Sequence, residues 1–137
     1  PESALTGAVL AAAGVSDAAE LIPWAASANA STLATLAPVV LNVAAGGDLR
    51  ANSIVSMAVE ELSLHVRSLA RKLFTDERAS VPLALTGGLL TAGSPLRKRL
   101  EHRLKSAVPG AHIHSGEIDA ARGAVRVALK HLAALAT

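Results

Sequence analysis

Residues 81–95 read VPLALTGGLLTAGSP, and this stretch decides the class of fold that we expect. Its first part, Val81–Thr86, is a short apolar run that stops at two glycines, which is the pattern of a buried strand. Ser94 and Pro95 then predict the start of a helix, because serine caps a first turn and proline fits its first position. The stretch therefore predicts a strand, a glycine turn and a helix in succession.

The same alternation continues to the end of the chain. After the helix, which ends before Pro109, Ala111–His114 predicts a second short strand and Asp119–Leu135 a closing helix. Strand, helix, strand, helix over residues 76–137 predicts parallel strands joined by a crossover. Two strands do not make a stable open sheet, so we expect this sheet to be incomplete. Apolar residues of the closing helix are expected to face inward: Ala121, Ala124, Val125, Ala128 and Leu132.

Residues 1–75 predict an all-helical amino-terminal segment, which makes the expected fold class a helix-rich α/β protein. The segment contains cap residues and glycine breaks rather than strand patterns. The expected helices are Glu2–Ala13, a second capped by Ser16 and Asp17 that runs to Trp24, a third capped by Ser31 that runs to Gly46, and a long fourth opened by Asp48. The apolar stripe of the fourth helix recurs every three or four residues: Ile54, Ala58, Leu62, Val66, Leu69 and Leu73.

Composition excludes several classes of protein. The chain has 137 residues, of which 51% are hydrophobic, and no cysteine, so disulfides, thiolate zinc sites and a cysteine nucleophile are excluded. A net charge of +2 gives no support for nucleic-acid binding. The apolar stretch Thr32–Ala45 is too short to span a bilayer, which needs about 20 apolar residues. We expect a cytoplasmic protein without a membrane segment, and Pro1 in place of methionine indicates a processed, trimmed or excised piece.

The glycines after the first predicted strand are the main candidate site. Ligands of parallel α/β sheets bind at the carboxyl ends of the strands, and glycine lets the backbone approach a flat or phosphorylated ligand closely. Gly87 and Gly88 thus indicate a nucleotide site, although a simple turn explains them as well.

Two further glycine segments are candidates. Gly46 and Gly47 separate two predicted helices and could offer backbone to a ligand, whereas Asp48 is better explained as a helix cap. Gly123 lies inside the closing helix, where it costs about 1 kcal/mol relative to alanine. We therefore expect another element, such as a helix, to approach it closely.

Charged and metal-ligating residues indicate less. His112 and His114 share one side of a predicted strand, but no third metal ligand is evident, and we predict no metal site. The basic run of residues 97–105 contains Arg97 and Lys105, each four positions from Glu101. This spacing predicts a solvated helix face with ion pairs.

Several segments in this order resemble one family, and the match runs over nearly the whole chain. They are Glu20–Ala25 (ELIPWA), Ala37–Ala51 (APVVL and AGGDLRA), Val59–Leu62 (VEEL), Thr86–Leu90 (TGGLL) and Ala120–Ala128 (AARGAVRVA). The chain is similar in them to the carboxyl-terminal half of the BadF/BadG/BcrA/BcrD-type ATPase and N-acetylglucosamine kinase family, within the sugar-kinase and actin-like ATPase superfamily.

The resemblance implies an incomplete ribonuclease-H-like, actin-type ATPase lobe. It implies a kinase that uses ATP and Mg²⁺, with an amino sugar as substrate of the complete protein. Nucleotide-binding residues would be Ala44, Gly47, Thr86, Gly87, Gly88, Leu89 and Leu90, and the interdomain hinge would include Gly123 and Ala124. The phosphate loops and the catalytic aspartate of such kinases belong to an amino-terminal lobe that this sequence lacks. We therefore predict no catalytic residue here, and that lobe is the expected partner.

Two alternatives remain open. The parent protein could be an ATPase activator of the same family, although that branch binds an iron–sulfur cluster through cysteines and this chain has none. The chain could also be a non-catalytic helical interaction module, whose alanine-rich helices form an interface such as that of a homodimer.

Overall fold

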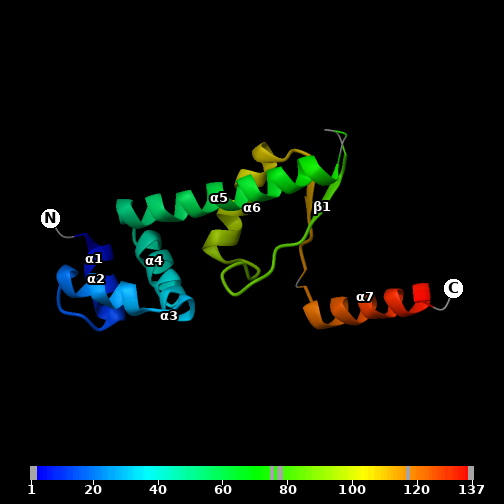
Figure 1. Ribbon diagram of the computed structural model, residues 1–137. Coiled ribbons are helices and arrows are strands. Elements are labelled where there is room, and N and C mark those ends of the chain that lie inside the picture. Colours follow the sequence, from blue (N-terminus) through cyan, green and yellow to red (C-terminus); the bar gives the residue numbers. More distant parts are fainter. Residues whose placement is uncertain (1–2, 75, 77–78, 117, 136–137) are drawn as a thin grey trace.

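The computed structural model describes residues 3–74, 76, 79–116 and 118–135. Helices α4 and α6 both pack against the long helix α5, and α1 packs against α4 (Figure 1). Helices therefore dominate, and two strands complete an α/β fold as predicted. The elements are α1 (Ala4–Ala13), α2 (Ala18–Ser27), α3 (Ala30–Ala34), α4 (Leu36–Ala45), α5 (Leu49–Leu73), β1 (Val81–Leu83), α6 (Pro95–Ala107), β2 (Ala111–Ile113) and α7 (Ala120–Leu135).

Helices of the first segment begin and end mostly at the predicted cap residues. Helix α1 stops at Gly14, whose φ of 70° places it in the left-handed region. Asp17 caps α2 by accepting the N–H of Glu20 at 2.9 Å, and Asp48 caps α5 by accepting the N–H of Ala51 at 2.9 Å. Local capping chemistry therefore explains these boundaries.

The single helix predicted to start at Ser31 is instead two helices, α3 and α4, that meet at Thr35. Asn29, not Ser31, is the cap of α3, since its side chain accepts the N–H of Thr32 at 2.8 Å. Pro38 lies in the first turn of α4, where its missing N–H costs no hydrogen bond within the helix, and this position favours a helix that begins just before it.

Helix α5 buries a different row of residues from the predicted stripe. Ile54, Leu69 and Leu73 of that stripe are exposed, while Leu62 and Val66 are partly buried beside the true contact row. The helix is packed by α4 near its start and by α6 farther along, and these neighbours determine which side becomes the inner one. The buried row recurs every four positions: Ala51, Val55, Val59 and Ser63.

The two strands pair in parallel, as the strand–helix–strand pattern predicted. Val81 lies opposite Ala111, and α6 forms the connection between the strands. Both strands are shorter than predicted, because regular pairing stops after Leu83 and Ile113. One face of this small sheet is bare, and the outward residues Pro82 and His112 are exposed.

A single core joins the helical segment to the strand-containing segment. Its largest fully buried side chains are Leu100 and Leu104 of α6, which meet α5 along its buried row. Leu85, just after β1, also belongs to this core. The carboxyl end of β1 is therefore held by packing, and the loop that follows starts from a fixed point.

Helix α7 differs from the other long helices because it buries none of its residues. Figure 1 shows it lying apart from the helical part of the molecule. The prediction that its apolar stripe faces inward is wrong for this chain, since nothing within the described residues covers it. The stripe still exists, and Val125, Leu129 and Leu132 are each more than half exposed.

We expect Asp48 to contribute stability that depends on pH. Its cap bond with the N–H of Ala51, assisted by the N–H of Leu5 at 3.3 Å, lowers the pKa of the Asp48 carboxyl below its usual value of 3.8. A folded pKa below the unfolded one gives stability that is present above the unfolded pKa and lost as pH falls through the folded pKa. Asp48→Asn should therefore be less stable than wild type at neutral pH, with a gap that narrows below about pH 4. Urea unfolding at several pH values measures this, and a gap that does not change with pH would contradict it.

Candidate functional site

The candidate site is the loop that follows β1, at the carboxyl end of the sheet. Gly87 has a backbone φ of 119°, which residues other than glycine rarely adopt. A tight turn follows, in which the N–H of Leu90 donates to the carbonyl of Gly87 at 2.9 Å. Ser94 closes the loop, because its hydroxyl donates to the carbonyl of Leu89 at 2.8 Å and accepts the N–H of Arg97 as the cap of α6.

Arg97 is a buried side chain that donates hydrogen bonds to this loop. The residue is only 4% exposed, and its Nε donates to Glu101 Oε1 at 2.7 Å. Its terminal nitrogens donate to the carbonyls of Leu90 at 3.2 Å, His114 at 3.0 Å and Leu85 at 3.4 Å. One guanidinium therefore joins the end of β1, the glycine loop and the residue just after β2.

The sequence prediction for Arg97 was half right. Its ion pair with Glu101 is present, but Arg97 does not lie on a solvated face, whereas Lys98 and Lys105 do. No ion pair joins Glu101 to Lys105 among the residues that the structure describes. The burial of Arg97 could have been predicted from its position in the helix. It precedes Leu100 and Leu104 by three and seven residues and therefore shares their buried face.

The loop borders a hollow of about 270 Å³. Gly88 lies on its wall with an ordinary backbone conformation and with no atom within 4 Å of the place where a Cβ would sit. The fold itself therefore does not require glycine at position 88, and the bare backbone is free to meet a ligand. The described lining residues are Leu85, Thr86, Gly87, Gly88, Leu90, Thr91, Ala92, Arg97 and Ile118.

Leu89 lies on the other side of the loop. It borders a separate apolar hollow of about 130 Å³ together with Val40 and Leu41 of α4 and Ile54 of α5. Of the predicted nucleotide residues, Thr86, Gly87, Gly88 and Leu90 thus share one hollow, and Leu89 packs toward the helices.

Ala44 and Gly47 lie elsewhere. Ala44 is buried where α4 meets α5, and its carbonyl accepts the amide of Asn52 at 2.8 Å. Gly47 has φ of 92° and forms the turn between these helices. The two hollows of about 270 and 130 Å³ that border the loop after β1 are lined by neither Ala44 nor Gly47. That these residues share a nucleotide site with the loop stays a prediction.

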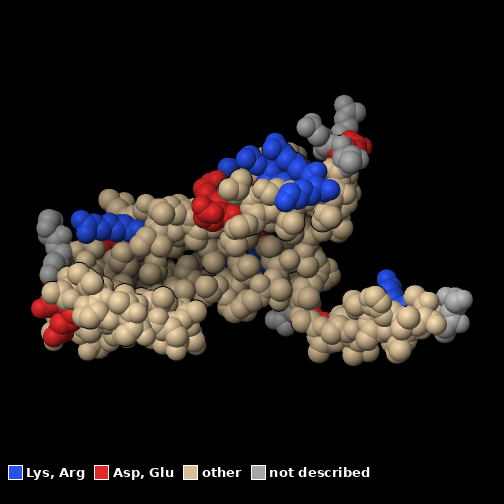
Figure 2. Space-filling model, viewed as in Figure 1, with Lys and Arg blue, Asp and Glu red and all other residues tan. Residues whose placement is uncertain are grey.

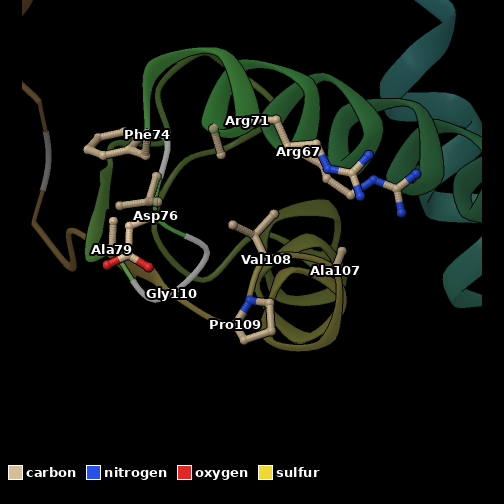
Figure 3. Close-up of a pocket in the computed structure, with 11 residues that line it drawn as sticks. Arg67, Arg71, Phe74, Asp76, Ala79, Ala107, Val108, Pro109 and Gly110 are labelled. Carbon is tan, nitrogen blue, oxygen red and sulfur yellow. The ribbon is translucent and has the colours of Figure 1, made fainter.

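A hollow of similar size, about 250 Å³, lies at the opposite end of the sheet. Figure 3 shows it between the end of α5 and the end of α6, with Arg67 and Arg71 on one side and Phe74 and Asp76 on the other. It borders Val81, at the amino end of β1. Because ligands of parallel sheets bind at the carboxyl ends of strands, we place the candidate site at the other hollow.

The remaining candidate residues are exposed. His112 and His114 both lie on the bare face of the sheet, and no cluster of three or more potential metal-ligating side chains occurs among the described residues. Gly123 and Ala124 lie on α7, and no atom is within 4 Å of a Cβ built on Gly123. The close approach expected at Gly123 is therefore not made by the described part of this chain.

Basic and acidic side chains form separate groups on the visible surface. Figure 2 shows lysine and arginine side chains gathered over the carboxyl-terminal half of α5, with acidic side chains beside them.

Among the described residues no single helix is both long and apolar enough to cross a membrane, while two bent helix pairs reach that length and composition only in combination.

Comparison with known proteins finds a distant relative. The chain is 28% identical over 132 residues to N-acetyl-D-glucosamine kinase of Dictyostelium discoideum. The aligned part covers 94% of this chain and 41% of that kinase, so the chain spans about two fifths of the relative's length. No family model matches, and no solved structure matches. The sequence is thus distantly similar to part of a sugar kinase.

Proposed function

We propose that this chain is the nucleotide-binding part of an ATP-dependent amino-sugar kinase with an incomplete actin-type ATPase lobe. The hollow beside Gly87 and Gly88 carries the proposal, because it lies where parallel sheets bind ligands and its backbone is bare at Gly88. The distant similarity to N-acetyl-D-glucosamine kinase supports the same assignment. N-acetylglucosamine is accordingly the first sugar to test in the complete protein.

The residues present fit a nucleoside better than they fit a metal ion. Leu85, Leu90 and Ile118 provide apolar contact for a base, and the glycine backbone allows close approach. No Asp or Glu occurs among the described residues that line the hollow, so they offer no carboxylate to Mg²⁺ there. ATP bound with Mg²⁺ supplies the phosphoryl group in such reactions. This chain would bind adenosine and orient the nucleotide.

The proposed partner is an amino-terminal kinase lobe that carries the phosphate loops and the catalytic base. Helix α7 offers an uncovered apolar stripe that includes Val125 and Leu132. An isolated amphipathic helix of this length is marginally stable in water, so burial against another lobe would stabilise it. Gly123 and Ala124 would then sit at the hinge between the lobes, where their small size permits close approach.

Nucleotide titration of the purified 137-residue chain tests the proposal. We expect ATP at millimolar concentration to shift the backbone NMR signals of Thr86–Leu90, and the chain alone to transfer no phosphate to N-acetylglucosamine. No shift in that loop would contradict nucleotide binding and favour the helical interaction module, which the uncovered face of α7 also suits. Sugar phosphorylation by the chain alone would contradict the proposal that the catalytic base belongs to an amino-terminal lobe.

Alanine substitutions at the two adjacent glycines should separate ligand binding from folding. Gly88→Ala adds a methyl group to the wall of the hollow without backbone strain, so we expect about tenfold weaker ATP binding, or about 1.4 kcal/mol, with stability equal to or slightly above that of wild type. Gly87→Ala forces a left-handed residue and should lower the free energy of unfolding by about 1 kcal/mol. Titration and urea unfolding measure the two effects. Unchanged ATP affinity in Gly88→Ala would place the nucleotide elsewhere.

A further inference from the structure

A single buried side chain connects the candidate nucleotide loop to the residue just after β2. Arg97 donates to the carbonyl of Leu90 inside the loop at 3.2 Å and to the carbonyl of His114 at 3.0 Å. His114 is the first residue after β2, and it begins the connector to α7, of which residues 114–116, 118 and 119 are described. Its N–H also donates to Leu83 at the end of β1, so this point is anchored to both strands and to Arg97.

The geometry of Arg97 makes the connection stiff. A guanidinium is a planar group whose donors have fixed relative directions, and its Nε is held by Glu101 at 2.7 Å. When one accepting carbonyl moves, the plane must tilt, and the other accepting carbonyls must follow or lose their bonds. The contact with Leu85, at 3.4 Å, is the longest of the three and is the one we expect to yield first.

Helix α7 has little else to determine its direction. Within the described part of the chain it buries no residue and packs closely against no other element, so its placement depends on the connector that precedes it. Ile118 of that connector lines the same hollow as Gly88. A ligand in the hollow would therefore meet the loop, Arg97 and the connector together.

We propose that Arg97 is a positioning residue that transmits nucleotide occupancy of the loop to the connector before α7, and so to the helix proposed to meet the amino-terminal lobe. This inference rests on the proposed nucleotide site. It goes beyond that site by naming the side chain through which ligand binding would bias the position of α7. Arg97 does not need to touch the nucleotide for this role.

The test compares two sets of backbone NMR signals during ATP titration of the 137-residue chain. The loop set is Gly87 and Gly88, and the connector set is Ser115 and Gly116. In the wild-type chain we expect both sets to shift with the same apparent Kd. In Arg97→Lys, whose ammonium keeps the charge but lacks the planar set of donors and the Nε bond to Glu101, we expect the ratio of connector shifts to loop shifts at saturating ATP to fall at least threefold.

Arg103→Lys is the matched control, since Arg103 lies on the same helix and binds Glu60 at the surface. It should leave both sets of shifts as in wild type. Connector shifts that are absent from wild type, or that survive in Arg97→Lys, would overturn the inference and leave the nucleotide site standing. A loop that does not respond to ATP would remove both.

A measurement on the unmodified chain covers the case in which Arg97→Lys does not fold. The Arg97 Nε–H is buried and bonded to Glu101, so its own NMR signal can be followed. Transmission through Arg97 requires this signal to shift with the same apparent Kd as Gly88. A signal that stays constant while the loop responds would rule out transmission through Arg97.

Discussion

Replacing Arg97 with methionine is expected to lower the free energy of unfolding by about 2 to 4 kcal/mol. Methionine keeps much of the side-chain volume but donates no hydrogen bond. The carbonyls of Leu85, Leu90 and His114 would each lose a partner, and the Glu101 carboxylate would lose its cation. Because Glu101 is about one third exposed, water would compensate part of its loss, and most of the cost would come from the carbonyls.

Arg103→Met provides the comparison for this prediction. Arg103 makes a two-pronged ion pair with Glu60, with contacts of 2.6 and 2.9 Å, at the surface of the same helix. Water replaces exposed bonds of this kind, so the loss should be smaller than that of Arg97→Met. Urea unfolding of both variants measures the difference. Equal losses would show that the buried bonds of Arg97 contribute no more than a surface ion pair.

Leu104→Ala should destabilise the chain by about 2 to 5 kcal/mol, by removing apolar contact and leaving a cavity. Leu104 is fully buried, at 0% exposure, in the core between α5 and α6. The exact loss depends on how far the surrounding side chains can close the cavity. Thermal and urea unfolding should both detect it.

The control is Leu69→Ala on α5. Leu69 belongs to the apolar stripe that the sequence predicted to face inward, yet it is 58% exposed. Its truncation should change stability by less than about 0.5 kcal/mol, as for other surface positions. A large loss in Leu69→Ala would show that another surface covers it in solution, and a small loss in Leu104→Ala would contradict the described core.

Elements whose boundaries depend on local chemistry were predictable. Gly14 stops α1, Asp17 and Asp48 cap their helices, and Ser94 caps α6 before its proline. Each of these signals acts within one turn of chain, so the sequence contains all the information needed. Pro38 was a local signal for the break at Thr35, because proline favours the first turn of a helix, but Pro23 lies inside α2 without ending it.

Inward and outward faces were harder to predict, because they depend on neighbours. Helix α5 has apolar residues on adjacent rows, and the positions of α4 and α6 decide that Val55 and Val59 are buried while Ile54 is exposed. The closing helix α7 shows the opposite case: its stripe is strongly apolar, but no described element covers it. A periodic pattern identifies the face, and only a partner buries it.

In the loop after β1, too, local structure was predictable from the sequence and long-range contacts were not. Its sequence, Thr86–Leu90, was sufficient to predict a glycine turn at the carboxyl end of a strand, because backbone freedom and strand pattern are local properties. That Arg97 lies beneath this turn, and bonds to carbonyls from 7 to 17 residues away in the chain, follows from how α6 crosses between the strands. Long-range bonds of this kind form only when packing excludes water from the guanidinium, and spacing alone does not specify that packing.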